Sequence, residues 1–200
     1  MRIISGTARG TKINSIEDIS TRPTLDRVKE SLYNIIQHLI KDSYVLDLFA
    51  GSGALGIEAL SRGASKAVFC DNNYECFKII KQNLEKTHLY TKADIYNLSY
   101  NDCITKISGQ MKFDIIFIDP PYKADIAINA TKEIIIHNLI KDNGLIIIET
   151  DEPERDENEL NILINELSNI CNIKLSDKRK YGRANLLFLS VNKENKDGNV

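Results

Sequence analysis

The chain has 200 residues, of which 42% are apolar and 27% are charged, and its formal net charge is −2. This length and composition predict one folded domain, or one domain with a small extension, and exclude a disordered chain. The four cysteines include no CxxC pair and the three histidines have no ligand spacing, so we expect packed, reduced thiols and no metal site. No apolar run reaches the length of a membrane span and the N-terminus has no signal-peptide pattern, which favours a cytoplasmic protein.

Helical and extended segments alternate along the chain after a polar leader. Apolar residues recur at helical spacing from Leu25 to about Ile40, and Thr24 is the expected N-cap of that helix. The expected strands that follow are Val45–Phe49, Ala67–Cys70, Asp94–Leu98, Phe113–Ile118, Leu145–Thr150, Asn172–Leu175 and Asn185–Val191. The expected helices between them are Ala54–Arg62, Tyr74–Thr87, Asn101–Ser108, Ile126–Ile140 and Asp156–Ser168.

Two of these strands, Phe113–Ile118 and Leu145–Thr150, are apolar at almost every position, which is typical of strands with both faces buried. Because helices separate such strands, we expect an α/β domain with a doubly wound, mostly parallel sheet of the Rossmann-like kind. The expected organisation is an N-terminal extension and helix over residues 1–42, a main domain over residues 43–192 and a polar tail over residues 193–200.

A glycine-rich loop joins the first strand of this pattern to the next helix. Gly51, Gly53 and Gly56 form a GxGxxG pattern, and Asp71 ends the following strand, 20 residues after Gly51. Glycines let the backbone approach a nucleotide, and a carboxylate at the end of the second strand accepts the ribose hydroxyls. The pattern predicts an adenosine-type ligand. The alternative is a glycine loop that only packs a helix, with Asp71 at the surface.

The identity of that ligand depends on Asp47, which interrupts the apolar strand before the glycine loop. An anion at this position would repel the pyrophosphate of NAD. The same charge suits the ammonium and sulfonium groups of S-adenosylmethionine, so we predict S-adenosylmethionine rather than NAD. The alternative role for Asp47 is to cap the loop.

The tetrapeptide Asp119-Pro120-Pro121-Tyr122 follows a buried strand, at the sheet edge where the glycine loop also lies. An exocyclic amino group on a base is a poor nucleophile, because its lone pair is delocalised into the ring. We expect the Asp119 carboxylate and the Pro120 carbonyl to accept its two N–H bonds, with Pro121 helping to fix the backbone. We expect Tyr122 to stack on a flipped base, so that the methyl group moves by direct displacement. The alternative is a rigid turn with a packed tyrosine.

Together these motifs resemble the bacterial small-subunit ribosomal RNA (guanine-N2)-methyltransferase D family over nearly the whole chain. The family-specific block is Arg22–Glu30, and the segments Arg2–Gly10 and Tyr181-Gly182 are similar as well. The resemblance implies a class I S-adenosylmethionine-dependent methyltransferase. It implies transfer to N2 of a guanine in 16S rRNA, at position 966 in the usual rRNA numbering, on the 30S particle or an assembly intermediate.

By motif match, the cofactor would be held by residues around the glycine loop and the next two strand ends, namely Asp47, Phe49, Ala50, Gly51, Gly53, Asp71, Asn72 and Ser99. Ser99 stands where many relatives place an acid or amide that meets the adenine amino group, so the adenine contact is open between Ser99 and a backbone group. The tetrapeptide would hold the target amine, and its catalytic residues would be Asp119, Pro120, Pro121 and Tyr122.

Two sets of basic residues are the expected RNA contacts. One set lies near the N-terminus and the other beside the final strand, and their members are Arg9, Lys12 and Arg22, and Lys178, Arg179, Lys180 and Arg183. The alternative for each set is a solvated basic face. The chain leaves no room for a second recognition domain, so we expect it to recognise a target presented by a folded ribonucleoprotein. We also expect a monomer.

Three other functions compete with this interpretation. The first is a methyltransferase for another amine, such as adenine N6 in DNA, cytosine N4 or a protein glutamine amide. The second is an NAD-dependent oxidoreductase built on the same loop, and the third is a catalytically inactive RNA-binding module. Asp47 and the tetrapeptide disfavour the oxidoreductase, and the intact tetrapeptide disfavours the inactive module.

Overall fold

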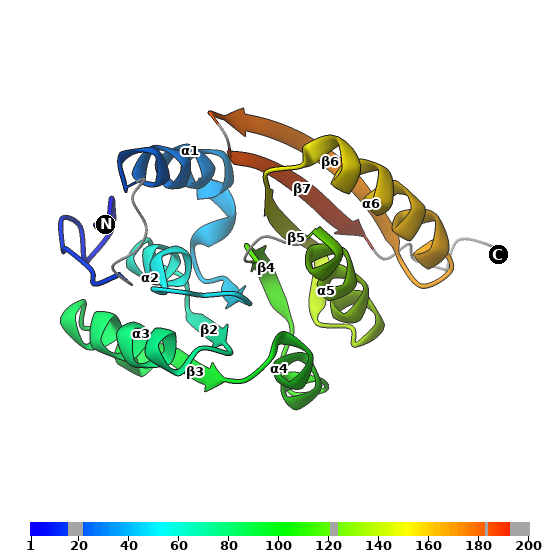
Figure 1. The fold of residues 1–200 in the computed structure, drawn as a ribbon. Helices are drawn as coiled ribbons and strands as arrows, with labels where there is room; N and C mark the ends of the chain where they lie inside the picture. Colours follow the sequence, from blue (N-terminus) through cyan, green and yellow to red (C-terminus); the bar gives the residue numbers. More distant parts are fainter. Residues whose placement is uncertain (16–21, 121–123, 183, 193–200) are drawn as a thin grey trace.

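A seven-stranded sheet forms the centre of the protein, in a computed structural model that describes residues 1–15, 22–120, 124–182 and 184–192 (Figure 1). The strand order is β3-β2-β1-β4-β5-β7-β6. The first five of these strands are parallel, while β7 runs antiparallel to both of its neighbours. The strands are β1 (Tyr44–Asp47), β2 (Lys66–Asp71), β3 (Ala93–Asn97), β4 (Phe113–Ile118), β5 (Ile140–Thr150), β6 (Asn172–Tyr181) and β7 (Ala184–Asn192).

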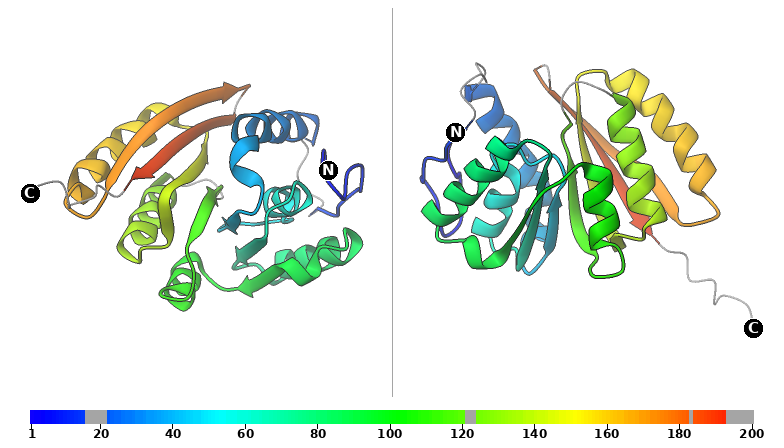
Figure 2. Two further views of the ribbon diagram at one scale, coloured as in Figure 1. Left: turned by 180° about the vertical axis from the view of Figure 1, so that it is seen from behind. Right: turned by 60° about the horizontal axis from the view of Figure 1, so that its bottom comes forward.

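Helices cover both faces of the sheet (Figures 1 and 2). One face packs against α1 (Arg22–Ile40), α2 (Ala54–Ser61) and α3 (Tyr74–Lys86). The other packs against α4 (Tyr100–Ile107), α5 (Ala124–Ile136) and α6 (Pro153–Leu167), and a short 3-10 helix, η1 (Tyr90–Lys92), precedes β3. The expected doubly wound, mostly parallel α/β fold is therefore confirmed.

Strands that are apolar on both faces hold this three-layer arrangement together. In β4, Ile115 and Phe117 pack into the core on the α1 side, whereas Ile116 and Ile118 pack into the core on the α5 side. Successive side chains of a strand point to opposite faces, so a continuous apolar run supplies both cores at once. The four cysteines are free and buried, as expected. Within the described ranges, no helix is both long and apolar enough to span a membrane.

Several element boundaries differ from the expectation. Helix α1 begins at Arg22, before the expected N-cap Thr24, and a proline is well tolerated in the first turn that results. Helix α5 ends at Ile136 because Asn138 takes a left-handed φ of 54°, and β5 then begins five residues earlier than expected. Strand β6 continues to Tyr181 because it pairs with β7 along its length, although its exposed lysines give no apolar strand signal.

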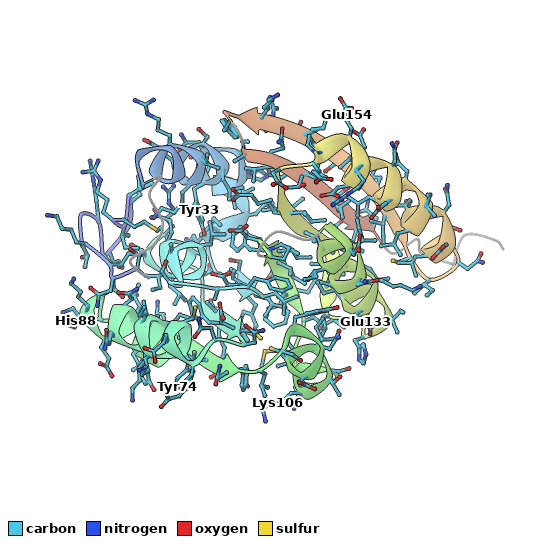
Figure 3. All side chains as sticks on the ribbon, viewed as in Figure 1. Tyr33, Tyr74, His88, Lys106, Glu133 and Glu154 are labelled. Carbon is cyan, nitrogen blue, oxygen red and sulfur yellow. The ribbon has the colours of Figure 1, made fainter. Side chains whose placement is uncertain are left out.

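The N-terminal leader, residues 1–15, docks on the α1–α3 side through a buried carboxylate. Glu58 on α2 is fully buried and accepts the N–H groups of Ile4 at 2.8 Å and Ser5 at 3.0 Å. Its oxygens also pair with Lys29 of α1 at 3.3 Å and with Arg62 at 2.7 Å. One side chain thus joins the leader, α1 and α2. Close to it, Tyr33 projects from α1 toward the sheet (Figure 3).

Candidate active site

The glycine loop between β1 and α2 has the backbone geometry that the GxGxxG pattern predicts. Gly51 and Gly53 have positive φ angles of 53° and 75°, and Gly53 is the N-cap of α2. Side chains rarely adopt such angles, so both positions favour glycine. A Cβ on Gly56 would lie 2.3 Å from the Phe69 ring, so the third glycine lets α2 pack directly on β2. A Cβ on Gly51 would meet nothing within 4 Å, so the backbone there borders open space.

Asp71 fastens the glycine loop to the end of β2. Its Oδ2 accepts the Gly51 N–H at 2.8 Å and its Oδ1 accepts the Asn73 N–H at 2.9 Å. The side chain of Asn97, at the end of β3, donates to the Asp71 carbonyl oxygen at 3.0 Å. The carboxylate is only partly buried and the neighbouring Asn72 is exposed, so both are accessible to a ligand at this edge.

Asp47 is buried at the end of β1, with 2% of its surface exposed. Its Oδ2 accepts the Gly56 N–H at 2.9 Å, so the capping role considered from the sequence is present. The pKa of Asp47 is raised to about 7: burial raises it most, the Gly56 hydrogen bond lowers it, and the charges of Asp119 and Asp71 also raise it. A ligand with positive charge would relieve this repulsion and favour the ionised form.

Two more carboxyl groups extend this arrangement across β4 and β5. Asp119 directly follows β4, and Glu149 is the penultimate residue of β5. Part of the Asp119 surface reaches solvent, but protein surrounds the rest of the residue. This partial desolvation raises the pKa of Asp119 to about 6. Burial and then the charge of Asp119 raise the pKa of the partly buried Glu149 to about 8.

Four adjacent strands thus place a carboxyl group at the same edge of the sheet, in the order Asp71, Asp47, Asp119 and Glu149. Ligands of open α/β sheets bind at this edge. The concentration of acids opposes a pyrophosphate and suits an ammonium and a sulfonium. The chemistry of these residues therefore fits S-adenosylmethionine; Asp47 and the glycine loop would hold its charged end, and Asp71 would hold its ribose.

The remaining expected cofactor residues line the same edge. Ala50 is buried and its N–H donates to the Cys70 carbonyl oxygen at 2.9 Å. The rings of Phe49 and Tyr100 pack together, with their centroids 5.5 Å apart. The Ser99 hydroxyl caps α4, since it accepts the Asp102 N–H at 3.2 Å and donates to the Asp102 carboxylate at 2.6 Å. An adenine contact at Ser99 stays a prediction.

The tetrapeptide and the basic residues are placed only in part. Pro120 is partly buried beside Asp119, whereas Pro121, Tyr122 and Arg183 lie outside the described residues. The backbone of Arg22 begins α1, and nothing is described of its side chain.

The leader lies beside α2, whereas β6 is the strand at one edge of the sheet, so the two basic sets come from separate elements (Figures 1 and 2). Arg9 and Lys12 are exposed on the leader. On β6, Lys178 pairs with Glu157 at 2.5 Å and Arg179 pairs with Asp177 at 2.8 Å, while Lys180 is exposed. Phosphates would therefore compete with existing ion pairs on β6.

Sequence reasoning missed three polar residues that organise the site. Glu149 adds a carboxyl group, and Glu58 anchors the leader. Asn83 of α3 donates to the Ser52 carbonyl of the glycine loop at 2.9 Å and to the Asn14 carbonyl of the leader at 3.0 Å. For Glu149 and Glu58 the available signal was a glutamate inside an otherwise apolar strand or helix, whereas no comparable signal marks Asn83.

The fold and the site define a class of protein, the Rossmann-like methyltransferases that use S-adenosylmethionine. The model of the family described as conserved hypothetical protein 95 matches residues 1–190. The ribosomal RNA small subunit methyltransferase D of Haemophilus influenzae is 39% identical over 153 residues, which cover 76% of this chain and 79% of the relative. The enzyme of the same name from Escherichia coli K12 is 36% identical over 145 residues, covering 72% and 68%. The chain belongs to this methyltransferase D family.

Solved structures agree with this assignment. A proposed methyltransferase from Escherichia coli superimposes with a TM-score of 0.77 at 27% identity, over 96% of this chain and 98% of that one. A proposed methylase from Haemophilus influenzae gives a TM-score of 0.73 at 31% identity, with the same coverage. S-adenosylmethionine is accordingly the cofactor, and the NAD-dependent alternative is not supported.

Proposed function

We propose that this protein transfers a methyl group from S-adenosylmethionine to the exocyclic N2 of a guanine in 16S rRNA, on the 30S particle or an assembly intermediate. The names of its relatives support rRNA of the small subunit as the substrate. The observation that carries the proposal is the position of Asp119. It follows β4 at the sheet edge where Asp47 and the glycine loop lie, and Pro120 comes directly after it.

The chemistry follows from what these groups can accept. Asp119 is exposed, so its carboxylate can take one N–H of a guanine amino group, and the Pro120 carbonyl can take the other. Both bonds draw the amino group away from planarity and leave its lone pair free. When bound, S-adenosylmethionine supplies an electrophilic methyl group on a sulfonium. Catalysis then rests on positioning and on the negative charge of the site.

Substrate recognition is assigned to the exposed cations and to Tyr122. Arg9 and Lys12 on the leader are free to follow phosphates, whereas Lys178 and Arg179 would first have to leave their carboxylate partners. Tyr122 is proposed to stack on the flipped guanine. The competing function is methyl transfer to N6 of an adenine, because the same hydrogen-bond acceptors could hold that amino group.

The test is transfer of labelled methyl from S-adenosylmethionine to 30S particles. Asp119→Ala should abolish transfer and leave cofactor binding nearly intact, because the variant removes an acceptor for the amine. Asp114→Asn is the matched control, since it changes an aspartate at the other end of β4, where Asp114 accepts the Tyr44 N–H at 2.7 Å. Full activity of Asp119→Ala would show that this carboxylate does not hold the amine.

A further inference from the structure

Glu149 is an acidic residue in a strand whose other central positions are apolar. It lies between the buried residues Ile148 and Thr150 of β5, and it is itself partly buried. Its cross-strand partner on β7 is Leu186, which offers no charge. A carboxyl group in such surroundings is costly to ionise, so its presence calls for a partner or a proton.

The sheet register places that carboxyl group beside Asp119. Ile118 of β4 is paired with Ile148 of β5, so the next residues along the two parallel strands are Asp119 and Glu149. Adjacent parallel strands are about 4.8 Å apart. Two carboxylates at neighbouring positions of adjacent strands repel each other, so the pair retains one proton over a range of pH.

We propose that Glu149 is a positioning residue of the amine-acceptor site, which holds the shared proton of the pair and so keeps Asp119 an ionised acceptor. The proposal rests on the proposed function. The location of the proton follows from exposure, because Asp119 is exposed and Glu149 is partly buried, and the neutral form is favoured in the less exposed group. The raised pKa values of both groups agree with this division.

The location of the proton decides what Asp119 can do. An ionised carboxylate accepts the N–H of an amine, whereas a protonated one donates and cannot hold the amine in the same way. In the transfer step, the nitrogen lone pair forms the N–C bond while the electron pair of the S–C bond stays on sulfur. The nitrogen then loses a proton to the Asp119 carboxylate, which passes it to solvent because it is exposed. Glu149 keeps its own proton throughout.

Burial is the largest cause of the raised Glu149 pKa, and among the charged groups around it Asp119 is the main influence. Asp47 on β1 lies beyond Asp119, and the phenol of Tyr33 on α1 donates to the Leu55 carbonyl. The nearest basic group in the same row of the sheet is Arg179 on β6, which is separated from Glu149 by Leu186 and pairs with Asp177. Asp119→Asn should therefore lower the pH at which Glu149 ionises.

The first test needs no RNA. Carboxyl NMR of the whole protein, with ¹³C-labelled glutamate and the Glu149→Gln variant for assignment, follows the ionisation of Glu149 directly. We expect a midpoint near the pKa of about 8, a decrease of about one unit in Asp119→Asn, and no change in the control Asp114→Asn. A midpoint in the ordinary glutamate range, or one that Asp119→Asn leaves in place, would overturn the proposal.

The second test uses single-turnover methyl transfer to 30S particles at pH 7 and pH 9. The wild-type rate should fall several-fold at the higher pH, because an ionised Glu149 repels the Asp119 carboxylate and displaces it from the position in which it accepts the amine. In Glu149→Gln, which is neutral at every pH, the ratio of the two rates should be close to one. If the ratio of the rates at pH 7 and pH 9 is the same in the wild type and in Glu149→Gln, Glu149 has a merely structural role and the proposal fails. If the wild type transfers no methyl group to RNA, the proposed function fails, and the NMR titration alone decides whether the carboxyl pair exists.

Discussion

Replacement of Glu58 by glutamine removes the charge that joins the leader to the rest of the protein and keeps the shape of the side chain. Each carboxylate oxygen of Glu58 accepts two donors. One takes the Ile4 N–H and the Lys29 ammonium, and the other takes the Ser5 N–H and the Arg62 guanidinium. An amide nitrogen on either side would face two donors, so the variant both loses an acceptor and introduces a repulsive contact.

The magnitude follows from burial. Lys29 and Glu58 have side chains that are 5% and 0% exposed, and removal of one partner from such a pair costs about 3–5 kcal/mol. Folded domains have total stabilities of about 5–15 kcal/mol, so the loss should be large but compatible with folding. The double variant Glu58→Gln/Lys29→Met should recover about 1–2 kcal/mol, because it removes a buried ammonium that keeps its hydrogen bond to the Arg2 carbonyl oxygen at 2.7 Å but has lost its carboxylate.

Urea unfolding followed by circular dichroism measures the free energy of unfolding of each variant. Glu75→Gln is the matched control, because Glu75 also pairs with a lysine at 2.7 Å in a helix but is 63% exposed. This control should cost less than about 1 kcal/mol. If Glu58→Gln costs no more than Glu75→Gln, Glu58 does not anchor the leader as described.

Two further predictions concern the leader and the cofactor. In a thermal scan, Gly6→Ala should lower the melting temperature more than Gly10→Ala does. Both glycines have positive φ, but a Cβ at Gly6 would meet the Ser61 carbonyl oxygen at 1.8 Å, whereas one at Gly10 meets nothing within 4 Å. Equal losses in melting temperature would contradict the docking of the leader. Titration calorimetry should show S-adenosylmethionine binding several-fold more tightly at pH 8 than at pH 6, because Asp47, with its raised pKa of about 7, is neutral below that pH and charged above it. Asp47→Asn should abolish this rise in affinity, and a rise that persists in the variant would assign it to another group.

The sequence predicts the architecture well because the information is local and repeated. The apolar run Phe113–Ile118 supplies both cores, and the glycines at positions 51 and 53 are required by positive φ angles. Boundaries that depend on tertiary pairing were less predictable. The basic half of β6 forms a strand only because β7 lies beside it.

The residues of the candidate site likewise fall into those that local sequence predicts and those that depend on tertiary structure. Asp47, Asp71 and Asp119 were found because each ends or directly follows a strand near a recognisable motif. Glu149 and Asn83 were not, because their roles depend on which strands are neighbours and on where the leader docks. A single sequence does not state that β4 and β5 are adjacent, and only this adjacency brings Glu149 to Asp119.

The identity of the methylated nucleoside tests the central claim most directly. The protein is incubated with isotope-labelled S-adenosylmethionine and 30S particles, the RNA is digested to nucleosides, and the labelled product is identified by mass spectrometry. The acceptor geometry and the family predict N2-methylguanosine. Recovery of the label in N6-methyladenosine, or in no nucleoside at all, would contradict the account.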